Sequence, residues 1–110
     1  MKLLCTQQDL ARALNIVNRA VSTNTTMPVL QNILLKAEGK KLSFSATNLE
    51  FAIHYSFDAD IKNEGSITIP AKLFSSYINL LSEKQIEIKV DDGWSLSLKT
   101  PHSRTKIKGI

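Results

Sequence analysis

The stretch AKLFSSYINLLSEKQIEIKVDDGWSLSLKT, residues 71–100, changes its hydrophobic period part-way along. Up to residue 82 the apolar side chains recur at helical spacing, whereas residues 85–90 and 94–100 alternate apolar and polar side chains, as half-buried strands do. Asp91-Asp92-Gly93 separates the alternating runs and predicts a type I′ hairpin turn. The apolar side of the predicted helix is formed by Leu73, Phe74, Tyr77, Ile78 and Leu81. We therefore expect a helix followed by a β-hairpin.

The first part of the chain has the same order of elements. A helix is predicted from about residue 7 to Val21, with Leu10, Leu14, Val17 and Val21 as its apolar stripe. The run after it, residues 29–37, carries apolar residues on both sides, and Gly39-Lys40 makes the next turn. Strands are predicted at residues 2–6, 29–37, 41–46, 49–57, 66–70, 85–90, 94–100 and 103–110.

Each half of the chain, about residues 1–60 and 65–110, thus contains a strand, a helix and three more strands. Two such units can pair their sheets and lay both helices side by side. We expect a single α+β domain over residues 1–110, with two strand–helix–strand–strand–strand repeats and two helices on one face of joined antiparallel sheets.

Composition narrows the class of protein. The chain has 110 residues, 43% hydrophobic and 22% charged, which suits one folded domain. One cysteine, Cys5, excludes an internal disulfide, and the reducing cytoplasm is the expected location. No apolar run approaches a membrane span, and no glycine-rich phosphate-binding loop is present. The net charge of +4 is compatible with nucleic acid without requiring it.

Carboxylates are missing from the bodies of both predicted helices: none lies between Asp9 and Glu38, or between Glu64 and Glu83. The helices instead carry Arg12, Asn15, Asn18, Arg19, Lys72, Ser75, Ser76 and Asn79. Such a surface would face a polyanion without repulsion, but so few bases would bind it weakly, because affinity grows with the number of counterions released. Scattered acids also leave gaps by chance, so an ordinary solvated surface is the alternative interpretation.

Three segments, TTMPVLQNILL (residues 25–35), LSFSATNLE (42–50) and ITIPAKLF (67–74), resemble the N-terminal domain of the bacterial DNA polymerase III beta subunit, the replicative sliding clamp family. The matching positions are Met1-Lys2, Met27-Pro28, Asn32, Thr47-Asn48-Leu49-Glu50 and Pro70-Ala71-Lys72. The resemblance covers essentially the whole chain, with its segments in the family's order and spacing.

The resemblance implies a non-catalytic protein without a cofactor. Clamps of this family have three similar domains per chain, and two chains close head to tail into a ring around duplex DNA that tethers the polymerase. The helices line the hole and the sheets form the outer wall. A weakly positive lining suits sliding, because a tight phosphate grip would act as a brake and base contacts would stall the ring. The second and third domains, which contact polymerase and clamp loader, are absent from this sequence.

The resemblance also suggests residues for two surfaces. The residues expected to face DNA are Arg12, Asn15, Arg19, Asn24, Lys72, Ser76 and Asn79. Asn24 stands where many relatives have a basic residue, so this loop contact departs from the family. The last strand is expected to pair with the other chain through His102, Arg104, Thr105 and Ile107. Basic residues on a sheet edge also simply discourage aggregation, which is the alternative reading of this strand.

Other functions have weaker support. Asp91 and Asp92 form the only carboxylate pair for an enzyme reading, and a turn explains them better. His54, expected on the solvent side of its strand, and His102 lack the clustered partners of a zinc site, and Cys5 is expected to be a packed thiol. The main alternative is a module that binds single-stranded nucleic acid or RNA. Trp94 and the tyrosines fall in line with core residues, which argues against an open stacking platform.

Overall fold

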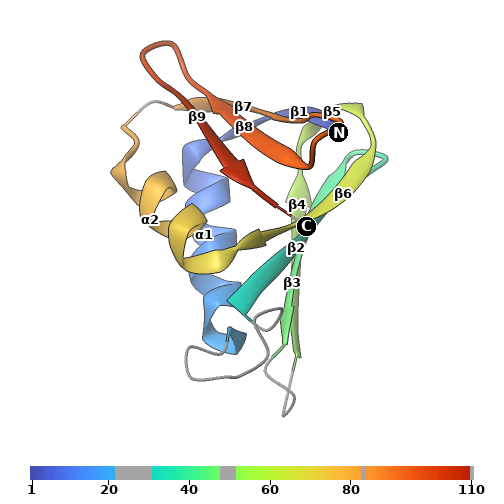
Figure 1. Cartoon of the computed structure of the whole chain (residues 1–110). Helices are drawn as coiled ribbons and strands as arrows, with labels where there is room; N and C mark the ends of the chain where they lie inside the picture. Colours follow the sequence, from blue (N-terminus) through green and yellow to red (C-terminus); the bar gives the residue numbers. More distant parts are fainter. Residues whose placement is uncertain (22–30, 48–51, 83, 110) are drawn as a thin grey trace.

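The computed structural model describes residues 1–21, 31–47, 52–82 and 84–109. They form two antiparallel sheets and two helices (Figure 1). The five-stranded sheet has the order β5 (Asp60–Asn63), β1 (Lys2–Thr6), β7 (Gln85–Val90), β8 (Ser95–Lys99), β9 (Arg104–Lys108). The four-stranded sheet has the order β4 (Ala52–Asp58), β3 (Lys41–Thr47), β2 (Asn32–Glu38), β6 (Gly65–Pro70). The helices are α1 (Gln7–Val17), extended by the 3-10 turn η1 (Asn18–Ala20), and α2 (Ala71–Leu80). The expected α+β fold is confirmed.

Each repeat gives its first strand to the sheet of the other repeat. β1 pairs antiparallel with β7, with Leu3 opposite Ile88, and β6 pairs antiparallel with β2, with Ile67 opposite Leu35. β5, which the sequence pattern did not predict, adds to the other edge of β1. Its four residues, DIKN, are too polar for a clear strand pattern, so pairing with β1 decides its conformation.

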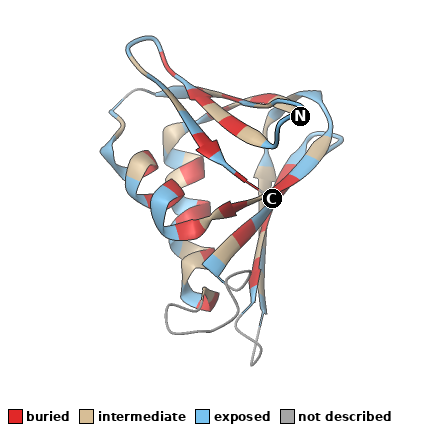
Figure 2. Ribbon diagram, viewed as in Figure 1, coloured by how far each residue is buried: buried red, intermediate tan, exposed pale blue. Residues whose placement is uncertain are grey.

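The helices bury one face each against the sheets. Thr6 caps α1, because its hydroxyl accepts a hydrogen bond from the Asp9 amide at 3.1 Å. Gln7, in the first turn of α1, donates from Nε2 to the Ile78 carbonyl in the last turn of α2 at 2.9 Å, and so satisfies a carbonyl near the end of that helix. α1 packs on α2 and on β3 and β4. The buried residues of both helices and both sheets form one core cluster, and Figure 2 shows them spread over all of these elements.

One expectation about burial was wrong. Leu73 is 57% exposed, because the buried stripe of α2 consists of Ala71, Phe74, Ser75 and Ile78. In β2 the apolar residues lie on both faces of the strand, as expected, but only one face is buried: Ile33 and Leu35 are in the core and Leu34 is 40% exposed. Neither helix of the described chain has the length and apolarity to cross a membrane.

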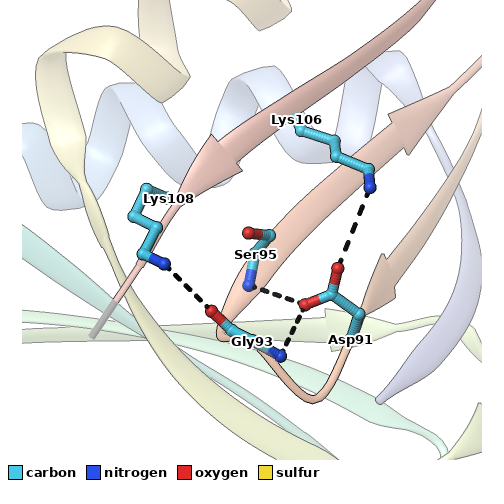
Figure 3. Close-up of polar contacts among 5 residues, drawn as sticks. All are labelled: Asp91, Gly93, Ser95, Lys106 and Lys108. Carbon is cyan, nitrogen blue, oxygen red and sulfur yellow. Dashed lines mark hydrogen bonds and ion pairs between the residues drawn. The ribbon is translucent and has the colours of Figure 1, made fainter.

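The turn between β7 and β8 also differs from the expected type I′ turn. The residue with positive φ is Trp94, at 59°, rather than the central pair Asp92 and Gly93. The Asp91 side chain organises the turn, since Oδ1 accepts from the Gly93 and Ser95 amides at 2.9 and 3.1 Å (Figure 3). Trp94 is 55% exposed, which corrects its expected place in line with the core. Its backbone is left-handed, so its side chain does not follow the alternation of buried and exposed residues along β8.

Candidate nucleic-acid interface

Three of the predicted DNA-facing residues, Arg12, Asn15 and Arg19, lie on α1 and η1 and are exposed. They recur three and four residues apart, on the side away from the buried stripe of Leu10, Ala13, Leu14 and Val17. Arg19 lies in the last turn of the helical segment, where a positive charge is favourable beside the carbonyl end of the helix.

Three more, Lys72, Ser76 and Asn79, are exposed on α2, four and three residues apart. Asn79 folds back along the helix, because its amide nitrogen donates to the Ser75 carbonyl at 2.9 Å. Ser75 itself is only 8% exposed and belongs to the buried side, contrary to its expected place on the helix surface. Because α1 and α2 contact each other, we refer to Arg12, Asn15, Arg19, Lys72, Ser76 and Asn79 together as the helix surface.

The cations of the helix surface are not neutralised within the described part of the chain. The ion pairs found there lie on strands and turns: Lys36 with Glu38, Lys41 with Asp58, Lys62 with Asp60, and Lys106 with Asp91. None of them involves Arg12, Arg19 or Lys72. The one carboxylate within α1, that of Asp9, lies in its first turn. Within the described part of the chain, the residues of the helix surface are therefore weakly cationic and polar.

The whole chain, residues 1–110, matches the family model described as DNA polymerase III beta subunit, N-terminal domain. The chain belongs to this family.

Relatives and solved structures agree with that assignment. The chain is 37% identical over 118 aligned residues to the beta sliding clamp of Synechocystis, covering 100% of this chain and 30% of the relative. The DNA polymerase sliding clamp of Caulobacter crescentus superposes with a TM-score of 0.94 at 34% identity, covering 100% of this chain and 30% of that one. The DNA polymerase III subunit beta of Pseudomonas aeruginosa gives 0.93 at 29%, with the same coverage. This chain thus spans about 30% of the length of its relatives.

The sliding-clamp family assignment favours the clamp reading over the single-strand or RNA-binding alternative. Because Trp94 is exposed, the aromatic residues do not exclude that alternative, and the comparisons decide between the two. Asn24, the loop residue that departs from the pattern expected of clamps, lies outside the described residues.

The predicted interface residues fall on β9 and the turn before it. β9 is the edge of its sheet, and among the described strands it pairs only with β8. His102 and Arg104 are exposed and Thr105 is half-buried. Ile107 is 3% exposed and packs in the core of the domain, which corrects its expected role as an external packing residue. The turn is tied to α2, because the Tyr77 and Ser103 hydroxyls lie 3.2 Å apart and share a hydrogen bond.

The other candidate sites have structural explanations. Burial raises the pKa of the Cys5 thiol to about 12, with a smaller contribution from Asp9, so the nucleophilic thiolate is suppressed. His54 is exposed and shares a 2.9 Å hydrogen bond with the Ser45 hydroxyl. Asp91 organises its turn, and no group of three metal-ligating side chains occurs among the residues that the structure describes.

Sequence reasoning missed a second basic surface, on the outer face of the five-stranded sheet. Its cations are Lys2, Lys89, Lys99, Arg104, Lys106 and Lys108, which all lie on the strand face opposite the buried residues. The signal in the sequence is the alternation of apolar and polar residues along β7, β8 and β9, which places the cations of these strands on one face of the sheet.

Proposed function

We propose that this chain is the DNA-tracking domain of a replicative sliding clamp, with its helix surface toward duplex DNA. The observation that carries the proposal is the charge of that surface: Arg12, Arg19 and Lys72 are exposed among amides and hydroxyls, and none of them has a carboxylate partner among the residues that the structure describes. The match of all 110 residues to the clamp family supports it.

The binding proposed for this surface is weak and independent of base sequence. Each phosphate neutralised on a duplex contributes about 0.9 to the slope of log affinity against log salt concentration. With so few cations, the free energy gained per domain is small, and the contact breaks and reforms easily. Asn15, Ser76 and Asn79 can exchange hydrogen bonds with phosphate oxygens or bridging water without fixing one register. A surface of this kind holds DNA loosely enough to slide.

In the whole protein we propose a ring of two chains, each with three similar domains, that encircles DNA in the cytoplasm and tethers the polymerase. The ring acts topologically and catalyses no reaction. The β9 edge supplies the contact between chains, through His102, Arg104, Thr105 and the strand backbone, while Ile107 supports the strand from inside. Polymerase and clamp loader bind mainly through the parts of the clamp outside this chain.

The test compares two variants that each lose the same positive charge. R12Q/R19Q/K72Q removes the cations of the helix surface, and K36Q/K41Q/K62Q removes strand lysines that are already ion-paired. Affinity for a labelled duplex is measured by fluorescence anisotropy at low salt over a salt series. We expect the wild-type chain to bind weakly and in a salt-sensitive way. In the first variant the affinity should fall about tenfold or more, a change of ~1.4 kcal/mol, and it should depend less steeply on salt concentration. The paired-lysine variant should lose much less.

Equal losses in both variants would show that only net charge matters and would refute the assignment of the helix surface. Tight binding that survives high salt would contradict the sliding mechanism. Changing the base sequence of the duplex should leave the affinity unchanged.

A further inference from the structure

The outer face of the five-stranded sheet forms a shallow, cation-lined depression. Its lining is Glu87, Lys89, Ser97, Lys99, Arg104 and Lys106, and its volume is about 270 Å³. We call these residues, together with Lys108 at the end of β9, the basic sheet face. They point away from Ile86, Ile88, Leu96, Leu98 and Ile107, which alternate with them along β7, β8 and β9 and fill the core.

Strand register explains the shape of the depression. Ser97 pairs with Lys89 on one side and with Lys106 on the other, so a small hydroxyl side chain forms the floor between two long lysines. In the next row Lys99 pairs with Glu87 and with Arg104. Neighbouring strands lie about 4.8 Å apart, so the cationic groups crowd around a common space above Ser97.

The charges of this face are incompletely neutralised within the described chain. Lys106 lies 3.9 Å from Asp91, and Lys108 donates to the Gly93 carbonyl at 3.3 Å (Figure 3). Lys89, Lys99 and Arg104 form none of the ion pairs of the described residues. Like charges held this close repel one another, and an external anion would relieve the repulsion.

We propose that the basic sheet face binds an extended, acidic peptide segment of a partner protein. Alternate side chains of an extended peptide recur about every 6.8 Å, which is also the repeat of Arg104, Lys106 and Lys108 along β9. A segment with a carboxylate at every second residue can therefore meet these cations in register. The guanidinium of Arg104 can bind a carboxylate with two hydrogen bonds, and Ser97 can donate to another.

Two features favour a peptide over a nucleic-acid strand. The lining contains no aromatic side chain, so bases would find no stacking surface there, and stacking supplies much of the affinity for single strands. Glu87 lies among the cations, where its carboxylate can accept a hydrogen bond from a peptide N–H, a donor that a phosphodiester backbone does not have. The site is separate from the helix surface, so the inference does not depend on the proposed DNA contact.

The experiment measures binding of a fluorescein-labelled peptide in which glutamate alternates with serine, by anisotropy at low salt. K89Q/K99Q removes two cations that form no ion pair with another described residue, and it leaves Arg104, which also lies at the β9 edge, in place. K36Q/K62Q is the matched control, since it removes two ion-paired lysines on other strands. R12Q/R19Q, on the helix surface, is the second control. We expect about tenfold weaker binding for K89Q/K99Q and nearly unchanged binding for both controls.

Three results would overturn the inference: no saturable binding of the peptide to the wild-type chain, equal losses in all three variants, or preference for an oligothymidylate of equal charge that depends on Lys89 and Lys99. The last result would make this face a nucleic-acid site instead. The helix-surface variant is measured in parallel, and DNA binding is tested separately. A negative result for the peptide would therefore not bear on the proposed DNA contact. Far-ultraviolet circular dichroism of each variant checks that the fold is retained.

Discussion

At the scale of single residues, Gly109 is held where no side chain fits. It follows β9 and packs against β6, and its amide donates to the carbonyl of Trp94, in the β7–β8 turn, at 2.8 Å. A Cβ at this position would lie 2.6 Å from Ile67 Cδ1 and 2.7 Å from the Thr68 carbonyl oxygen. The end of the described chain thus packs directly on the four-stranded sheet, and its backbone links the two sheets.

We predict that Gly109→Ala destabilises the domain by about 1–3 kcal/mol, because the new methyl group forces Ile67 and the backbone of β6 to move. Urea denaturation followed by circular dichroism measures the change. Gly93→Ala is the control, since its Cβ would meet only Asp91 Oδ1, at an ordinary 3.4 Å. A Gly109 variant as stable as wild type, or a control that loses as much, would show that this packing can adapt.

At the scale of elements, the β7–β8 hairpin depends on one carboxylate. Hydrogen bonds from the Ser95 amide, followed by the Gly93 amide and the charges of Lys106 and Lys108, lower the pKa of Asp91, while desolvation opposes the shift. The same side chain also contacts the next strand, because Lys106, 3.9 Å away, lies on β9. The local sequence predicted a turn here but not its geometry, since Asp-Gly suits several hairpin turns and the position of the left-handed residue depends on strand register.

The lowered pKa predicts how stability depends on pH. Asp91 binds its proton more weakly in the folded chain, so its contribution is complete above the unfolded value, near pH ~3.9, and is lost as pH falls through the lower folded value. Asp91→Asn keeps a side-chain oxygen acceptor but has no charge to titrate. In urea titrations at a series of acidic pH values, wild type should therefore lose more stability than Asp91→Asn. Parallel acid curves for the two proteins would contradict this role of Asp91.

At the scale of the whole molecule, the exchange of first strands makes the two repeats interdependent. β1 belongs to the sheet of the second repeat and β6 to that of the first, so neither sheet is complete within one half of the chain. The helices share the interior between them. Small domains with one continuous core usually unfold in a single transition, and this connectivity strengthens that expectation.

Leu35→Ala tests this coupling. Leu35 is fully buried on β2 of the four-stranded sheet, and its truncation should cost about 2–5 kcal/mol. Trp94, the only tryptophan, reports on the hairpin of the other sheet. We expect the urea midpoint from Trp94 fluorescence to fall together with the midpoint from circular dichroism. A fluorescence transition that stays at its wild-type midpoint while circular dichroism shifts would show that the sheets unfold separately.

The candidate helix surface was largely accessible from sequence, and the basic sheet face was not recognised. Helical spacing places Arg12 and Arg19 opposite a buried stripe, so their exposure follows from periodicity alone. Leu73 was misassigned because several helical registers fit the apolar residues of α2, and only packing against the sheet selects one. Ile107 was misassigned for a similar reason: alternation pairs it with Thr105 but does not say which face of the strand is the core.

The sequence by itself determined most of the helices and strands and the turns between them, because the local hydrophobic period indicates that one side of an element is buried. It does not indicate which other element that side packs against. Only the tertiary structure decided that β1 joins β7, that β6 joins β2, that β5 forms at all, and that Lys89, Lys99 and Lys106 gather around Ser97. These are contacts between residues far apart in the chain, and their free energy exists only once the whole core has assembled.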